Sequence, residues 1–191
     1  MVELNKKYRI GVVKFGFINW IGFKSLWLKE CSRFMKVWQQ TLLSPLVSSL
    51  LFLSVLTLAL GSDRGEVLGY PFIIFLAPGL IAMSILTQSF SHSVSSLMIA
   101  KMQGNIVDML YAPLSALEVS LAIILAALTR SFLIAIISIF VFSLIVEVPI
   151  SNIFLIFIFG LLSSFILGSL GFISGLWAEK FDHTATITNF I

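Results

Sequence analysis

Polar side chains lie inside two long apolar stretches of this sequence, where they could do chemistry. Gln88, Ser91, His92 and Ser95 fall in the second half of one stretch, and Arg130 falls in the middle of a later one. Amide, hydroxyl, imidazole and guanidinium groups in apolar surroundings are costly unless they face water or one another. We predict that these five side chains line a polar cavity or path.

Among these five side chains, Arg130 would be the most costly to expose to lipid. It follows Glu118 by twelve residues, which is about 18 Å along a helix. A charge at that depth of a bilayer costs about 2.5–3.5 kcal/mol unless it faces protein or water. We predict that Arg130 faces the helix bundle or the path, and the alternative is that its long side chain snorkels toward the membrane surface.

A second set of residues has the pattern of a short docking helix. In the otherwise polar segment 101–116, apolar side chains recur at helical spacing beside polar ones. We predict that a partner contacts this set, which consists of Asn105, Ile106, Asp108, Met109 and Leu110. The alternative is a plain solvated loop, although exposed apolar side chains favour a partner. Pro113 and a capping box at Ser115 and Glu118 join the segment to the next helix.

Enzymatic motifs are absent from the sequence. It holds no G-x-x-x-x-G-K-[ST] phosphate loop, no H-E-x-x-H, no C-x-x-C and no G-x-S-x-G. The single cysteine, Cys31, excludes a disulfide framework, and His92 and His183 lack metal-ligand spacing. We expect no catalytic residue, no metal and no cofactor.

The composition indicates that much of this chain is surrounded by lipid. Of its 191 residues, 59% are hydrophobic and 11% are charged, and the mean hydropathy is +1.07. Soluble domains contain roughly 45–50% apolar and about 25% charged residues. The excess apolar surface predicts an all-α, polytopic transmembrane protein that contacts membrane lipid.

Four apolar stretches are each long enough to span a bilayer, because about 20 helical residues cross about 30 Å of hydrocarbon. They cover about 41–61, 70–97, 117–146 and 152–177. The chain then divides into a basic segment with an interfacial helix at 1–40 and a transmembrane domain at 41–191. The closing residues turn apolar again after Ile187, which predicts the start of a fifth span.

An amphipathic helix is predicted over residues 17–38, directly before the first span. At 100° per residue, one face collects six apolar side chains: Trp20, Phe23, Trp27, Cys31, Phe34 and Trp38. Lysines and arginine lie opposite, and tryptophans with lysines favour the membrane–water boundary. An ordinary amphipathic helix packed on a protein core is the alternative.

The basic residues predict the orientation. Eight of the twelve lysines and arginines precede Thr41, which places the N-terminus in the cytoplasm by the positive-inside rule. Segments 101–116 and 178–186 then share the cytoplasmic side, while residues 61–66 and Glu147 lie on the other. The basic residues do not indicate nucleic-acid binding, because no folded basic domain surrounds them.

Small residues recur in the fourth predicted span at spacing that lets two helices approach closely. They are Gly160, Ser164, Gly168, Gly171 and Gly175. We predict that this face packs against another span. The alternative is that the glycines reflect only the general frequency of glycine in membrane helices.

Three stretches carry a family resemblance, in order along the chain. They are residues 40–46 (QTLLSPL), residues 75–83 (FLAPGLIAM) and residues 104–118 (GNIVDMLYAPLSALE). The set resembles the permease subunits of type-2 ABC transporters, the exporter class. Family members show a similar Pro-Gly-Leu in the second span, and a leucine pair followed by Pro-Leu-Ser and a glutamate.

The resemblance implies a non-enzymatic permease of an ATP-driven exporter in the inner (plasma) membrane. Its implied partners are a separate ABC ATPase subunit and a second permease copy. It assigns segment 105–110 to ATPase coupling, with a second cytoplasmic contact at Glu179, Lys180, Phe181 and Asp182. Complete members have six spans, so we expect this sequence to be truncated at its C-terminus.

Other functional classes explain the sequence less well. Secondary transporters and channels, the main alternative, often show inverted repeats and midplane charges, whereas this sequence shows no repeat and one candidate charge. An intramembrane serine protease would need a serine and a histidine at recognisable spacing on adjacent spans. A purely structural membrane subunit is the third alternative.

Overall fold

The computed structural model describes residues 18–60, 67, 69–146 and 152–188. Several sequence predictions therefore lie outside the described residues. They concern the part of the basic segment before residue 18, the segment 61–66, Glu147, and the apolar end at 189–191.

The described residues form helices and no strand, apart from a single bridge between Val67 and Tyr70. The elements are α1 (Trp20–Lys36), η2 (Gln39–Leu43), α2 (Ser44–Leu60), α3 (Phe72–Met102), α4 (Ile106–Tyr111), α5 (Ala116–Ser143), α6 (Ile153–Trp177) and α7 (Phe181–Thr188). Four stretches are long and apolar enough to cross a membrane: Gln39–Ala59, Phe72–Met102, Ala116–Ser143 and Ile153–Trp177. The prediction of an all-α polytopic membrane protein is confirmed.

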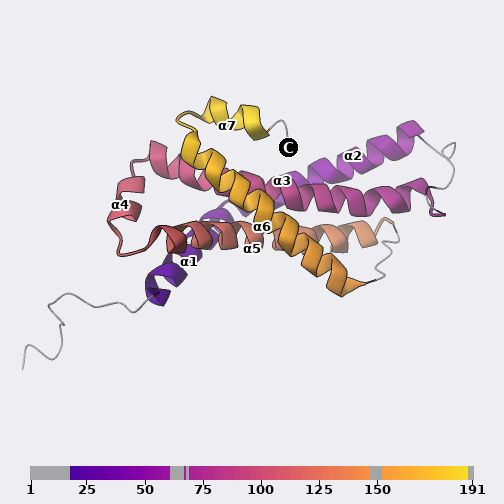
Figure 1. Cartoon of the computed structure of the whole chain (residues 1–191). Coiled ribbons are helices and arrows are strands. Elements are labelled where there is room, and N and C mark those ends of the chain that lie inside the picture. The colour runs from indigo at the N-terminus through magenta and orange to yellow at the C-terminus, as the bar shows by residue number, and fades with distance from the viewer. Residues whose placement is uncertain (1–17, 61–66, 68, 147–151, 189–191) are drawn as a thin grey trace, which may run out of the picture.

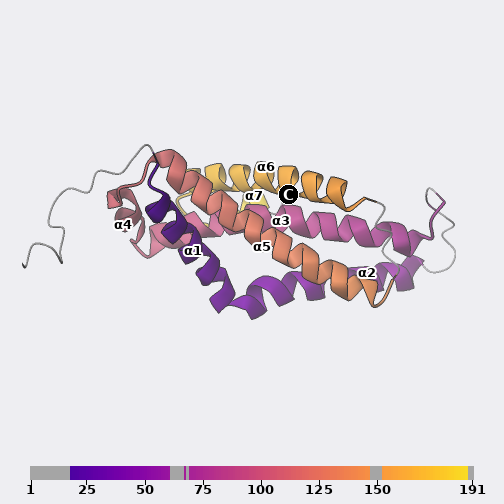
Figure 2. The same cartoon turned by 90° about the horizontal axis from the view of Figure 1, so that it is seen from below.

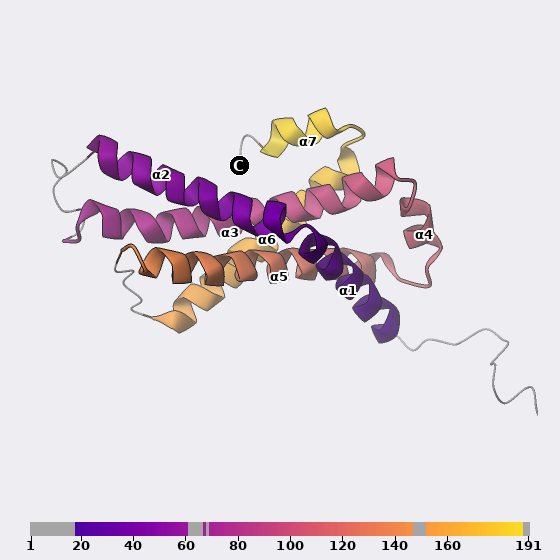
Figure 3. The same cartoon turned by 180° about the vertical axis from the view of Figure 1, so that it is seen from behind.

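Helices α3 and α5 lie in the middle of the bundle, with α6 on one face and α1 and α2 on the opposite face (Figures 1, 2 and 3). The start of α1, helix α4 and the C-terminal ends of α3 and α6 lie at one end of the bundle (Figure 1). The two segments predicted to contact a partner therefore lie at the same end as the basic helix α1. The side of the membrane that this end faces stays a prediction.

The small residues of α6 form its contact with α3. Ser164, Gly168, Gly171 and Gly175 are buried, and a Cβ atom at Gly171 would lie 2.5 Å from the carbonyl oxygen of Phe90. No side chain larger than hydrogen fits there without a shift of backbone. The prediction that this face packs against another span is confirmed.

Helix α1 turns only part of the predicted apolar face to the bundle, because Phe23, Trp27 and Phe34 pack there while both ends of that face do not. Leu26, Glu30 and Phe34 are buried, whereas Trp20 and Trp38 at the two ends of the predicted apolar face are exposed. The buried residues recur every four positions, so they form one stripe along the helix. The buried stripe therefore runs beside the predicted face and has Glu30 in its middle, a residue that the predicted apolar face did not include.

Helix α3 is longer than the predicted second span, which ended at residue 97. It continues to Met102 because neighbours satisfy the polar groups of its last turns. Ser96 Oγ donates to a carboxylate oxygen of Glu30 at 2.7 Å, and Lys101 Nζ donates to three carbonyls at the end of α6, at 2.7–2.9 Å. In contrast, α5 ends at Ser143, three residues before the predicted end of the third span.

The Gly171 contact generates the first prediction. Replacing Gly171 with alanine should destabilise the protein by about 1–3 kcal/mol, because the new methyl group overlaps the backbone of Phe90. The measurement is the thermal unfolding midpoint of the purified protein in detergent. Gly160→Ala is the matched control on the same helix, since its nearest neighbour would be a Phe132 ring atom at 3.8 Å. Equal midpoints for the two variants would contradict this account of the contact.

Candidate functional site

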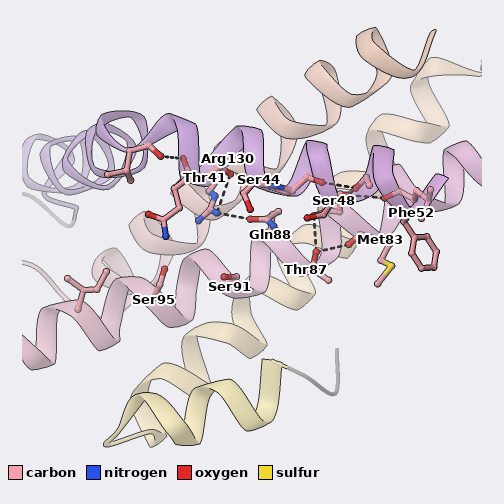
Figure 4. A pocket seen from close by; sticks show the side chains of 17 residues that line it. Thr41, Ser44, Ser48, Phe52, Met83, Thr87, Gln88, Ser91, Ser95 and Arg130 are labelled. Carbon is pink, nitrogen blue, oxygen red and sulfur yellow. Dashed lines mark hydrogen bonds between the residues drawn. The ribbon is translucent and has the colours of Figure 1, made fainter. Parts of the chain in front are cut away.

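A polar groove lies between α2, α3 and α5 (Figure 4). Its volume is about 650 Å³. Four of the five predicted cavity residues line it, namely Gln88, Ser91, Ser95 and Arg130. Residues from three elements far apart in sequence therefore meet in one wall, and the fifth predicted residue, His92, does not belong to it.

Arg130 reaches the groove from α5 and joins α3 to the start of α2. Its Nη2 atom donates to Gln88 Oε1 at 2.6 Å and to the Thr41 carbonyl at 3.4 Å. In an α-helix the N–H of residue 45 would donate to that carbonyl, but Pro45 has no N–H. The proline thus leaves an acceptor for the arginine at the point where the π-helical turn η2 passes into α2.

The remaining groove wall grades from polar to apolar. Hydroxyl groups of Ser44, Ser48 and Ser91 line its middle, and Phe52 and Met83 line one end (Figure 4). Other hydroxyls are already occupied within the wall, because the Oγ atoms of the lining residues Ser49 and Ser84 lie 3.0 Å apart. Such a surface offers hydrogen bonds and one cation beside an apolar face, which suits an amphiphilic solute.

His92 lies inside the bundle, away from the groove. Its ring is fully buried and packs edge-on against Phe34, with ring centroids 5.7 Å apart. The side chain lies on the same helix as the groove serines but one position farther round than Ser91, which turns it from the groove toward α1. The grouping of His92 with the cavity residues was therefore wrong in geometry.

Glu30 is the residue that sequence reasoning missed. It is buried on α1, accepts a hydrogen bond from Ser96 and forms an ion pair with Arg33 at 2.9 Å. His92 Nε2 lies 3.9 Å from the same carboxylate oxygen. Burial lowers the pKa of Arg33, and the charge of Glu30 acts in the opposite direction. The available signal was the four-residue spacing of Glu30 from Leu26 and Phe34.

The predicted docking segment forms the short helix α4, but its exposed apolar set differs from the predicted one. Leu110 is 78% exposed and Tyr111 is 86% exposed, with Val107 beside them. Met109 is instead buried against Leu26 and other core residues. It anchors α4 to the bundle, and the prediction that it would face a partner does not fit its burial.

The other predicted members of this set lie nearer the surface. Asn105 and Asp108 are exposed and Ile106 is half-buried. At the second predicted contact, Glu179, Lys180 and Asp182 are exposed, and the side chain of Phe181 lies outside the described part of the chain. The structure brings both segments to the same end of the bundle (Figure 1).

The carboxylate of Glu118 joins the start of α5 to the start of α1. One of its oxygens accepts from the Ser115 backbone N–H at 2.7 Å, and the Ser115 hydroxyl accepts in return from the Glu118 N–H. The predicted capping box is thus confirmed. The other Glu118 oxygen accepts from the backbone N–H of Asn19, whose side chain also donates to the Pro113 carbonyl at 3.0 Å. The segment after α4 is therefore bonded to the start of α1.

In the described part of the chain, no group of three or more His, Cys, Asp or Glu side chains could hold a metal ion. The site consists of the polar groove between α2, α3 and α5, and of the short helix α4, which is packed against the bundle at one end. This combination suits a membrane protein that moves a solute and receives a mechanical input.

Known proteins agree with this description. The family described as ABC-2 type transporter matches residues 21–191. The inner membrane transport permease YadH of Escherichia coli (strain K12) is 27% identical over 174 residues, which cover 91% of this chain and 68% of YadH. The YadH proteins of E. coli O157:H7 and Shigella flexneri match to the same extent. No solved structure matches the chain significantly.

The chain belongs to the ABC-2 type transporter family. It is accordingly a membrane-spanning permease of an ABC transporter, as its sequence motifs predicted. The match covers all three stretches that carry the resemblance, at residues 40–46, 75–83 and 104–118.

The groove geometry generates the second prediction. In a Cys31→Ala background, cysteine at Ser91 or Ser95 should react with a water-soluble thiol reagent, because both positions line the groove. Cysteine at His92 should stay protected, since that side chain is fully buried. Labelling is measured by mass shift of the protein in membranes. Native Cys31 is removed to avoid background, although burial raises the pKa of its thiol and keeps its thiolate scarce. Protection at both serine positions would show that the groove is closed to water.

Proposed function

We propose that this chain is the permease subunit of an ATP-driven exporter in the inner (plasma) membrane, with its N-terminus in the cytoplasm. A separate ABC ATPase supplies the energy, and a second copy of the permease completes the transport unit. The groove lined by Gln88, Ser91, Ser95 and Arg130 forms part of the translocation path. The name of YadH, an inner membrane transport permease, supports this location.

The proposal rests on one observation: α4 exposes one apolar face and packs its opposite face against the bundle. Its exposed face presents Val107, Leu110 and Tyr111, an apolar surface outside any predicted span, which favours a protein partner. Its opposite face is fixed to the bundle through Met109. A partner that moves α4 would therefore move the bundle and not a slack loop.

Two sets of hydrogen bonds would transmit such a movement from this end of the bundle to other helices. The Glu118 carboxylate bonds the backbone of Ser115 and Asn19, so a push on α4 reaches α5 and α1 together. Lys101 bonds the last carbonyls of α6, which lie next to the second predicted contact at residues 179–182. We infer that both contacts meet the ATPase and act on one rigid end of the bundle.

Export as the direction of transport rests on the family resemblance. The cytoplasmic position of the N-terminus is supported by helix α1, which carries exposed lysines at 24, 29 and 36. Basic side chains on a helix beside the first span favour the anionic cytoplasmic leaflet. This leaflet is also the side on which ATP is available.

Coupling generates the third prediction. Leu110→Asp combined with Tyr111→Asp should abolish copurification of the ATPase, because charges replace the two most exposed apolar side chains of α4. The measurement is the amount of ATPase recovered with a tagged permease. The double variant should reach the membrane in normal amounts, since neither side chain packs in the bundle.

Gln103→Asp is the matched control, because it adds a negative charge at an exposed position of the same segment without removing an apolar contact. It should keep the ATPase bound. If the complex survives the Leu110 and Tyr111 changes, docking does not run through α4 and the proposed coupling route is wrong.

A further inference from the structure

Arg130 is a buried cation without a carboxylate partner in the described part of the chain. The residue is only 8% exposed. Both ion pairs found among the described residues belong to Glu30, which pairs with Arg33 and approaches His92. The acceptors that Arg130 does have, the Gln88 amide and the Thr41 carbonyl, are neutral. A buried guanidinium ordinarily pairs with an anion, because desolvation of an unpaired charge is costly.

The hydrogen bonding of Arg130 is incomplete as well. Its Nη2 atom makes both bonds, and the bond to Thr41 is long at 3.4 Å. Its Nε atom is buried and has no acceptor among the described residues. A guanidinium has five N–H donors arranged for bidentate contact with carboxylate or phosphate. A purely structural clamp between α5 and α2 would leave fewer of these donors unused.

The described surroundings do not neutralise the charge. The buried carboxylate of Glu30 is paired with Arg33 at 2.9 Å and not with Arg130. The groove therefore carries an uncompensated positive charge in its wall. Hydroxyls of Ser44, Ser48 and Ser91 surround the same space and can donate to an anion (Figure 4).

The groove also has room and an apolar end. Its volume of about 650 Å³ lies in the range of small-molecule sites. Phe52 and Met83 line the part away from Ser95 (Figure 4). An anionic group held at Arg130 would therefore sit beside an apolar surface that accepts a hydrocarbon portion of the same molecule.

We propose that the groove binds its substrate through an anionic oxygen group of the phosphate type, which Arg130 pairs and the groove serines hydrogen-bond. This inference rests on the proposed function, since it names the substrate class of the same path. The chemistry has two possible sources, the headgroup of an amphiphile and a free anion.

The test uses the permease with its ATPase, purified in dodecyl maltoside in phosphate-free buffer. Monododecyl phosphate, inorganic phosphate and dodecyltrimethylammonium are titrated, and binding is followed by the thermal unfolding midpoint. Monododecyl phosphate should bind saturably, and the cationic amphiphile with the same tail should not. Tighter binding of monododecyl phosphate than of inorganic phosphate identifies an amphiphile, and equal binding identifies a free anion.

Variants locate the site. Arg130→Gln should weaken phosphate binding by about tenfold or more, which is the expected loss of a charge-assisted hydrogen bond. Arg130→Lys should fall between, because it keeps the charge and loses the bidentate geometry. Lys29→Gln removes an exposed charge outside the groove and should bind as the unchanged protein does.

Two results would overturn the inference: equal binding by Arg130→Gln and the unchanged protein, or equal binding of the anionic and cationic amphiphiles. The second comparison needs no variant, so it stands even if Arg130→Gln does not fold. Recovery of the ATPase is measured on the same preparations. Loss of the ATPase from the unchanged permease would contradict the proposed function alone, whereas an intact complex indifferent to phosphate would contradict only the anion site.

Discussion

Helix association inside a bilayer gains little from hydrophobic burial, because lipid tails are as apolar as the side chains that would be buried. Polar bonds and close backbone contact are therefore important in holding this bundle together, and many of them involve α3. Four side chains of α3 reach four neighbours: Ser84 to Ser49 of α2, Gln88 to Arg130 of α5, Ser89 to the Ser164 carbonyl of α6 and Ser96 to Glu30 of α1. The serine-rich half of α3 therefore forms hydrogen bonds to four other helices of the bundle.

These contacts differ in their exposure to water. We call the part of the bundle that is joined by buried contacts the scaffold, and the contacts that line the groove belong to the translocation path. The Ser89 contact is buried, and Gly171 brings the backbones of α3 and α6 together beside it. Gln88 and Ser84 instead line the groove, where their bonds to α5 and α2 compete with water and solute. The buried contact between Ser131 and Ser164 also joins α5 to α6. We infer that α3, α5 and α6 move as one body, and that α2 with η2 is the part that moves against it. Pro45 supports this division, because it interrupts the backbone bonding at the start of α2.

The features that sequence predicted well depend on local spacing. The capping box at Ser115 needs only the next turn of the same helix, and the small-residue face around Gly171 follows from repetition along one helix. Glu30, His92 and Met109 were misjudged because their surroundings come from other helices. A glutamate among lysines suggests a solvated face, yet Glu30 faces Ser96 across the α1–α3 contact. Likewise, the apolar pattern of α4 does not tell which side chain, Met109 or Leu110, faces the bundle.

If α2 moves against α3 in this way, the groove between these two helices changes shape during transport, which couples the solute path to the ATPase. In a Cys31→Ala background, cysteines at Ser49 and Ser84, whose Oγ atoms lie 3.0 Å apart, should cross-link under oxidation. A second pair of cysteines, at Ser131 and Ser164, provides the control, because the Oγ atoms of these two serines lie 3.1 Å apart within the scaffold. ATP hydrolysis by the reconstituted complex should be lost with the first cross-link, return on reduction and persist with the second. Full hydrolysis with Ser49 and Ser84 cross-linked would contradict the account.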